Sequence, residues 1–192
     1  MKNPPLIIDL TESLELLSYK TKGDCCSDSG AKDLHIWLSP KMMQTQAKRI
    51  TQALIQLFPT HTELYQRNLS SLLKELEQID QELATTLKNK QGKAILVSHP
   101  AFAYFCRDYK FEQLSLEEEG KDCLPQYIPE LLHKIKTLGI GGIIIEPQHG
   151  SKAAKLLAQS LKIPTYIIDP YSEDYIENLK EMAEVVKNII HD

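Results

Sequence analysis

The second half of the chain alternates between short apolar runs and segments with helical spacing. Continuous apolar runs at 93–99 (KAILVSH), 141–147 (GGIIIEP) and 164–170 (PTYIIDP) are typical of buried parallel strands. The stretch 111–116 (FEQLSL) alternates apolar and polar positions, which also predicts a strand. Strands that alternate with helices indicate βα units around a mainly parallel sheet. We therefore predict a four-stranded α/β lobe over residues 93–192, flanked by helices.

The closing segment of this lobe is predicted to be an amphipathic helix. Its apolar positions fall on one side at spacings of three and four residues: Tyr175, Leu179, Met182, Val186 and Ile189.

A long helix is predicted ahead of this lobe. Apolar residues alternate spacings of four and three on a narrow stripe, and Gly92 ends the pattern. About 30 residues at a rise of 1.5 Å would give a helix of roughly 45 Å. The stripe spans about four heptads. This length fits either a coiled-coil arm or a beam-like helix that crosses a globular body, so the period does not decide between the two. The stripe consists of Tyr65, Leu69, Leu72, Leu76, Ile79, Leu83 and Leu87.

The N-terminal third is less regular. From Pro40 the pattern is helical until Pro59 interrupts it, with Met43, Ala47, Ile50, Leu54 and Leu57 recurring every three or four residues. The run 6–10 (LIIDL) predicts a short strand or a helix start. Residues 11–20 have helical spacing, with Thr11 as a candidate cap. Residues 21–33 are turn-formers and predict a polar loop.

Composition and charge argue against several classes of protein. The chain has 192 residues, of which 42% are hydrophobic and 25% charged, which is ordinary for a globular protein. The net charge of -4 gives no electrostatic reason to expect a nucleic-acid partner. No apolar run approaches the roughly 18 residues of a membrane span. The N-terminus lacks the unbroken apolar segment of an export signal, so we expect no signal peptide in this chain.

The four cysteines form no CxxC pair, which argues against a zinc ribbon or a thioredoxin-type motif. Two interpretations stay open for Cys106 and Cys123: a disulfide, if the protein matures outside the cytoplasm, or free thiols.

Polar side chains follow each predicted strand, at the edge where ligands of such sheets gather. Imidazole and carboxylate groups without a thiolate suit a borderline divalent ion such as Zn²⁺ or Mn²⁺. His35 would complete a set of three if its segment faces the strand ends, although the spacing alone favours a capping or core histidine. The residues after the strands are His99, then Glu117, Glu118 and Glu119, then Gln148 and His149, and finally Asp169.

Several motifs carry a family resemblance. The stretches DLHIWLSP (33–40) and VSHPAFAYFCRDYKF (97–111) resemble two motifs of the solute-binding proteins of zinc and manganese ABC transporters, a family that includes surface adhesins. Residues 117–136 and 142–170 also match the family in order and spacing. The resemblance implies two α/β lobes joined by a rigid long helix, with a metal ion in the cleft between them. It divides this chain into a first-lobe remnant (1–58), a linking helix (59–92) and a metal-binding lobe (93–192).

The same resemblance implies a function. His35, His99 and Asp169 would be metal ligands, with Glu119 and His149 as candidates to border the cleft. The ion would be Zn²⁺ or Mn²⁺, or iron, and the histidine at position 99 favours zinc or a mixed specificity. The protein would be a periplasmic or membrane-anchored extracytoplasmic component, not an enzyme, that delivers its ion to an ABC-transporter permease.

Departures from the family pattern indicate a fragment. Members run to roughly 300 residues, about two domains' worth. This chain lacks most of the first lobe, including its histidine ligand, and Leu34 and Pro100 replace motif residues. The loop at 21–33 has no His where zinc-specific members carry a His-rich loop. We expect an open three-ligand site to bind metal weakly. We also expect residues 1–40 to be partly mobile or repacked.

Two other functions remain as alternatives. Two histidines and a carboxylate also form the catalytic pattern of zinc hydrolases, with Glu119 or Glu146 as general base, although no HExxH motif occurs. The other alternative is an adhesin-like or regulatory interaction module whose long helix pairs with another chain. His61, His133 and His191 are expected to be ordinary solvated residues.

Overall fold

The computed structural model describes residues 6–18, 31–118, 121–122, 126, 128–148 and 152–190. Its centre is a sheet of four strands in the order β2-β1-β5-β6. Every neighbouring pair is parallel, which confirms the predicted α/β class. The strands are β1 (Ala94–Val97), β2 (Glu112–Ser115), β5 (Ile143–Ile145) and β6 (Thr165–Ile167).

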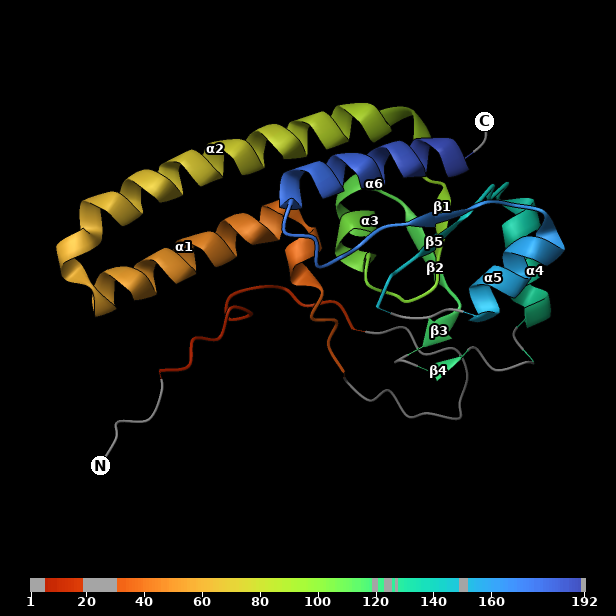
Figure 1. The fold of residues 1–192 in the computed structure, drawn as a ribbon, viewed down its shortest axis with the longest axis horizontal. Helices are drawn as coiled ribbons and strands as arrows, with labels where there is room; N and C mark the ends of the chain where they lie inside the picture. The colour runs from red at the N-terminus through yellow and green to blue at the C-terminus, as the bar shows by residue number, and fades with distance from the viewer. Residues whose placement is uncertain are drawn as a thin grey trace.

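Helices cover both faces of the sheet, and the alternation of side chains along β1 separates two cores. Ile95 and Val97 pack with α2 (Thr62–Leu87), α3 (Ala103–Tyr109) and α6 (Tyr175–Ile189). Ala94 and Leu96 pack on the other face with α4 (Ile128–Thr137) and α5 (Lys152–Leu161). Figure 1 shows α6 beside the C-terminal part of α2, on the opposite side of the sheet from α4 and α5. The central strands β1 and β5 are buried at every position, whereas the outer strands β2 and β6 are only partly buried.

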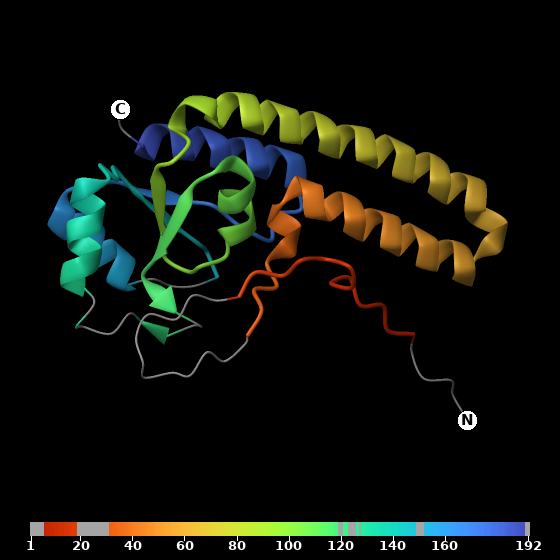
Figure 2. The same cartoon turned by 180° about the vertical axis from the view of Figure 1, so that it is seen from behind.

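The long helix α2 forms a hairpin with α1 (Pro40–Leu57) that projects from the sheet, as Figures 1 and 2 show from opposite sides. A short 3₁₀ turn, Pro59–His61, joins the two helices. Of the predicted stripe, the C-terminal half is buried: Leu76, Ile79, Leu83 and Leu87. The N-terminal half lies on the projecting part, where Leu72 is exposed. The C-terminal half of α2 thus packs on the body of the molecule, in the beam arrangement, and its N-terminal half has α1 as its partner.

Helix α1 begins as the sequence chemistry favours, with a Pro in its first turn. The Ser39 side chain caps it by accepting a hydrogen bond from the Met42 backbone N–H. The buried face is Pro40, Met42, Gln46, Ala47 and Ala53, whereas Ile50 and Leu57 are exposed. The helix is as predicted, but the face that it buries is rotated from the predicted stripe because its partner α2 covers only one side.

The N-terminal segment is neither the predicted strand at 6–10 nor a helix at 11–18. Residues 10–13 form a turn in which Ser13 has a φ of 70°. Thr11 caps no helix, because its hydroxyl donates to the Asp9 carboxylate at 2.6 Å. The leucines of this segment pack against a small cluster instead, so this part is packed as well as irregular. The cluster consists of Ile36, Met42 and Tyr104, and the packed leucines are Leu14, Leu16 and Leu17.

A small antiparallel pair of strands, β3 (Glu117–Glu118) with β4 (Lys121–Asp122), follows β2. Cys106 is a buried free thiol, and Cys123 lies outside the described residues. Within the described part of the chain, no helix is long and apolar enough to cross a membrane. The division at residues 58 and 92 stays a prediction.

Candidate metal site

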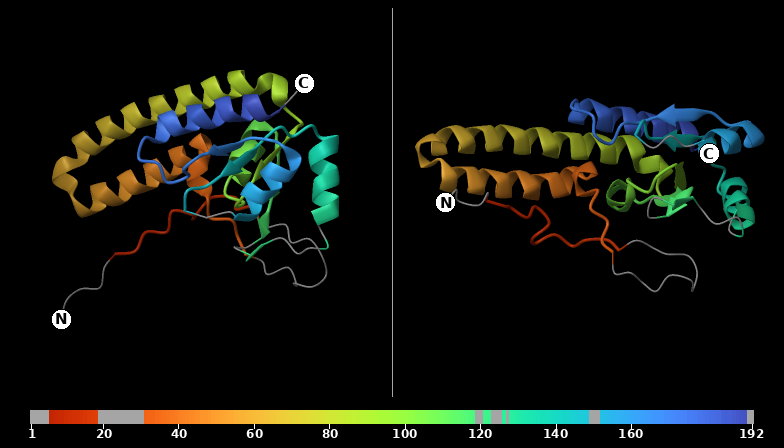
Figure 3. Two further views of the ribbon diagram at one scale, coloured as in Figure 1. Left: turned by 45° about the vertical axis from the view of Figure 1, so that its right-hand side comes forward. Right: turned by 60° about the horizontal axis from the view of Figure 1, so that its bottom comes forward.

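The parallel sheet brings the ends of its strands to one edge. From β1 the chain passes to β2 on one side, and it later enters β5 on the other side of β1. This switch in direction is where ligands of open α/β sheets bind. His99 follows β1 and Asp169 follows β6, two strands whose carboxyl ends point the same way. Figure 3 shows the sheet and its connections from two further sides.

His35 lies just before a 3₁₀ turn, Ile36–Leu38, that leads into α1. Its Nδ1 lies 2.6 Å from Oδ1 of Asp33, and its backbone N–H donates to the same oxygen at 2.9 Å. The imidazole is 12% exposed and the Asp33 side chain 3%. His35 occupies the N-cap position of the turn but makes no capping hydrogen bond with its side chain, so the capping interpretation is wrong.

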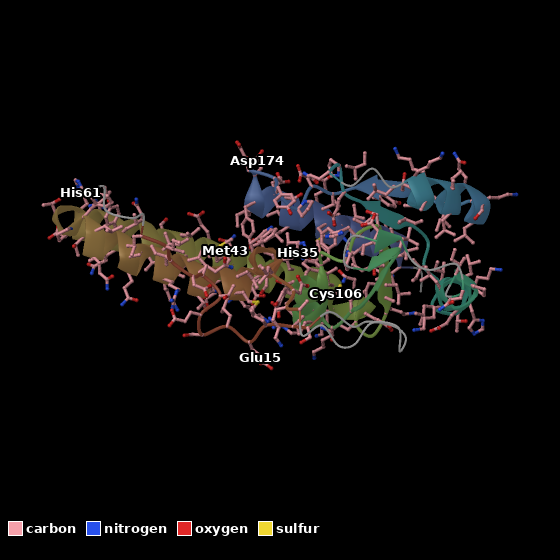
Figure 4. The ribbon with its side chains drawn as sticks, turned by 90° about the horizontal axis from the view of Figure 1, so that it is seen from below. Glu15, His35, Met43, His61, Cys106 and Asp174 are labelled. Atoms are coloured by element: carbon pink, nitrogen blue, oxygen red, sulfur yellow. The ribbon has the colours of Figure 1, made fainter. Side chains whose placement is uncertain are left out.

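A second histidine meets the first. The rings of His35 and His99 lie edge to face, with centroids 5.4 Å apart. His99 Nδ1 lies 3.2 Å from Oε2 of Glu117, a contact in which both side chains are largely buried. Each imidazole thus has a carboxylate at Nδ1, the arrangement that fixes Nε2 as the metal-binding atom in many metal sites. Figure 4 shows His35 where the helical hairpin joins the sheet, far from His61 at the hairpin's tip.

Asp169 is held by neighbours of its own. Its Oδ1 accepts hydrogen bonds from Gln148 Nε2 at 2.6 Å and from the backbone N–H of Tyr171 at 2.9 Å. The carboxylate is half-buried, and the Asn178 side chain donates to its backbone carbonyl at 2.9 Å. Two donors on one oxygen orient the carboxylate.

Trp37 connects the His35 segment to the loop that carries Asp169. Its indole N–H donates to the carbonyl of Pro170 at 2.8 Å, and its ring lies 5.4 Å from that of Tyr171. The Tyr175 hydroxyl donates to the Trp37 carbonyl at 2.8 Å. Burial raises the pKa of Tyr175, which keeps this hydroxyl protonated as a donor. Two chain segments far apart in sequence are therefore fixed to each other.

The structure brings two of the three predicted ligands together, and the role of the third remains a prediction. His35 and His99 lie together. Within the described residues, no group of three or more His, Cys, Asp or Glu side chains is arranged to hold a metal ion. The participation of Asp169 therefore stays a prediction. Glu119 and His149 lie outside the described residues.

The sequence did not predict that each histidine has a carboxylate partner. Glu117 was one of the polar residues predicted at the sheet edge, and the structure pairs it with His99. Asp33 received no role, although an acid two residues before a histidine was a signal that could have been used. Its significance depends on the local backbone conformation, in which the same Asp33 oxygen contacts both the backbone N–H and Nδ1 of His35.

Comparisons with known proteins show the family of the chain. A family described as "Zinc-uptake complex component A periplasmic" matches residues 2–189. The chain belongs to this family. A crystal structure of ZnuA, 30% identical, superimposes with a TM-score of 0.86 over 95% of this chain and 68% of that one. A zinc-bound deletion mutant of ZnuA matches with the same identity and TM-score over 96% of this chain and 69% of its own.

Among curated relatives, a "Putative metal-binding protein" of Chlamydia trachomatis serovar D is 32% identical over 183 residues, which cover 95% of this chain and 65% of that protein. The "High-affinity zinc uptake system protein ZnuA" of Bacillus subtilis is 29% identical over 84% of this chain and 51% of its own length. The chain thus spans between about half and two thirds of the length of these relatives.

Proposed function

We propose that this ZnuA-family chain captures zinc as part of the extracytoplasmic solute-binding component of an ABC metal importer. The observation that carries the proposal is the edge-to-face meeting of His35 and His99, each with a carboxylate at Nδ1. This pairing is what a zinc site built from imidazole ligands requires. The zinc-binding names of the matching relatives support the same conclusion.

The proposed ligand set is His35, His99 and Asp169. Two imidazoles and one carboxylate, without a thiolate, suit zinc, with manganese and iron as the next candidates. Cys106 contributes no ligand, because it belongs to the hydrophobic core. Asp169 reaches the ion through the loop that Trp37 ties to the His35 segment. Water or another group fills the fourth tetrahedral position.

Capture and release fit this chemistry better than catalysis. A donor set of two histidines and one carboxylate also occurs in zinc hydrolases, but the family match covers nearly the whole chain and points to transport. The partner that receives the ion is the membrane permease of the importer. A screen with ester and phosphoester substrates in the presence of zinc is expected to give no turnover.

Calorimetric titration with zinc tests the proposal. We expect His35→Ala and His99→Ala each to remove most of the binding, because the remaining imidazole and carboxylate cannot hold the ion alone. His61→Ala is the matched control, since this exposed histidine lies at the tip of the helical hairpin and should leave the affinity unchanged. Zinc binding that survives the loss of both site histidines would refute the assignment.

A further inference from the structure

The Asp33 carboxylate is buried beside His35 with its two oxygens in different environments. Oδ1 accepts two hydrogen bonds, from the backbone N–H of His35 at 2.9 Å and at 2.6 Å from its Nδ1. Oδ2 is buried and has no hydrogen-bond partner among the described residues. Among the salt bridges of the described residues, Asp33 contacts His35 and no lysine or arginine. A buried carboxylate of this kind opposes folding unless a positive charge compensates it.

The surroundings of Asp33 hold its backbone firmly. The Tyr104 hydroxyl donates to the Asp33 carbonyl at 2.6 Å and accepts from the backbone N–H of Leu17 at 3.0 Å. The backbone N–H of Asp33 donates to the Leu17 carbonyl at 2.8 Å. These contacts hold the main chain together with the carboxylate, whose Oδ1 accepts from the backbone N–H of His35. The contact of the same oxygen with His35 Nδ1 is additional to these backbone contacts.

We propose that Asp33 is a positioning residue for zinc capture that lowers the stability of the metal-free fold. It fixes His35 as the tautomer with hydrogen on Nδ1, so that Nε2 carries the lone pair toward the ion, and it places an uncompensated negative charge beside the site. The cation then supplies the missing compensation when it binds. This inference rests on the proposed function, because it concerns the same site.

The substitution Asp33→Asn separates this role from a purely structural one. Asparagine keeps an acceptor oxygen for both His35 hydrogen bonds but removes the charge. We expect zinc affinity to fall about 10- to 100-fold, as for other groups that hold a metal-binding histidine. We expect the urea midpoint of the metal-free protein to rise, because the substitution removes the buried charge. A midpoint that stays the same or falls, or an unchanged zinc affinity, would overturn the proposal.

Nitrogen-15 NMR of the metal-free protein at pH 8 gives a readout that does not depend on zinc. The His35 ring should have its hydrogen on Nδ1 in the wild type, and Asp33→Ala should shift it toward the Nε2–H tautomer. A ring with its hydrogen on Nε2 in the wild type would refute the positioning role even if zinc binds. Failure of the proposed function looks different: zinc affinity would then be insensitive to His35→Ala and His99→Ala.

Two further variants complete the design. Glu117→Gln tests the second pair, and we expect a smaller loss of zinc affinity because its contact with His99 is longer and this side chain is more exposed than Asp33. Asp80→Asn is the matched control, because Asp80 accepts a hydrogen bond from the Tyr109 hydroxyl at 2.9 Å on α2. It should lower the urea midpoint and leave zinc affinity unchanged. If Asp80→Asn weakens zinc binding as much as Asp33→Asn, the proposal fails.

Discussion

His35 and His99 lie edge to face with ring centroids 5.4 Å apart, although one precedes α1 and the other follows β1. The contact unites the segment ahead of the helical hairpin with the edge of the sheet. The single tryptophan of the chain, Trp37, lies 5.4 Å from His35 by ring centroids. A metal ion that binds at the two histidines would therefore lie next to the indole of Trp37.

Trp37 fluorescence should report metal binding. Zinc fixes the His35 ring near the indole, so we expect a saturable change in emission on titration with Zn²⁺. Mg²⁺ prefers oxygen ligands and should produce no change. His35→Ala should abolish the response. A zinc-induced change that persists without His35 and His99 would place the ion elsewhere.

The buried half of α2 should dominate its contribution to stability. Leu83 is 1% exposed in the core shared by α2 and α6, whereas Leu72 is 39% exposed on the projecting part. We expect Leu83→Ala to lower the free energy of unfolding by about 2–5 kcal/mol, because it leaves a cavity. Leu72→Ala should cost less than about 1 kcal/mol. Urea denaturation measures both, and equal costs would contradict the beam arrangement.

The Tyr175 hydroxyl should stabilise the connection to the site. Tyr175→Phe removes its hydrogen bond to the Trp37 carbonyl, and we expect a loss of about 1–3 kcal/mol in the free energy of unfolding because the acceptor is left without this donor. Tyr171→Phe is the control, since Tyr171 is exposed and contacts Trp37 through its ring. Thermal unfolding of the two variants gives the comparison. A Tyr175→Phe variant as stable as the wild type would show that the connection contributes nothing.

Stability should fall at alkaline pH. Burial raises the pKa of Cys106, Tyr109 and Tyr175 above the ordinary values of 9.0 for cysteine and 10.0 for tyrosine. The unfolded chain therefore releases these protons first, so the stabilisation is complete below the ordinary values and is lost as the pH rises above them. Urea midpoints should hold up to about pH 8 and decline toward pH 10.5. Cys106→Ala should delay the onset of the decline. A flat profile would contradict the burial of these groups.

The sequence predicts the sheet well because its central strands, β1 and β5, are buried along their whole length. Continuous apolar runs such as 93–99 have few other structures available, and the helices between them force a parallel arrangement. Helical spacing in 11–18 gave a wrong prediction for a physical reason. Leu14 and Leu17 recur at helical distance because both contact a tertiary cluster around Tyr104, not because the backbone is helical. Tertiary packing overrides a local pattern in a short segment.

The candidate site was only partly predictable. Residues after buried strands could be placed at one edge, which located His99 and Asp169. The Asp33–His35 contact could not be found in this way, because a carboxylate two residues before a histidine reaches its ring only in a particular local backbone conformation. Glu117 is one of three consecutive acids. Its position beside His99 depends on the small β3–β4 hairpin, whose register no sequence periodicity reveals.

Anomalous diffraction from crystals grown with zinc, measured on both sides of the zinc absorption edge, tests the central claim most directly. The account predicts a peak about 2.0–2.1 Å from Nε2 of both His35 and His99, with a carboxylate oxygen of Asp169 at a similar distance. A zinc peak at another place on the chain, with the two imidazoles without metal, would contradict it.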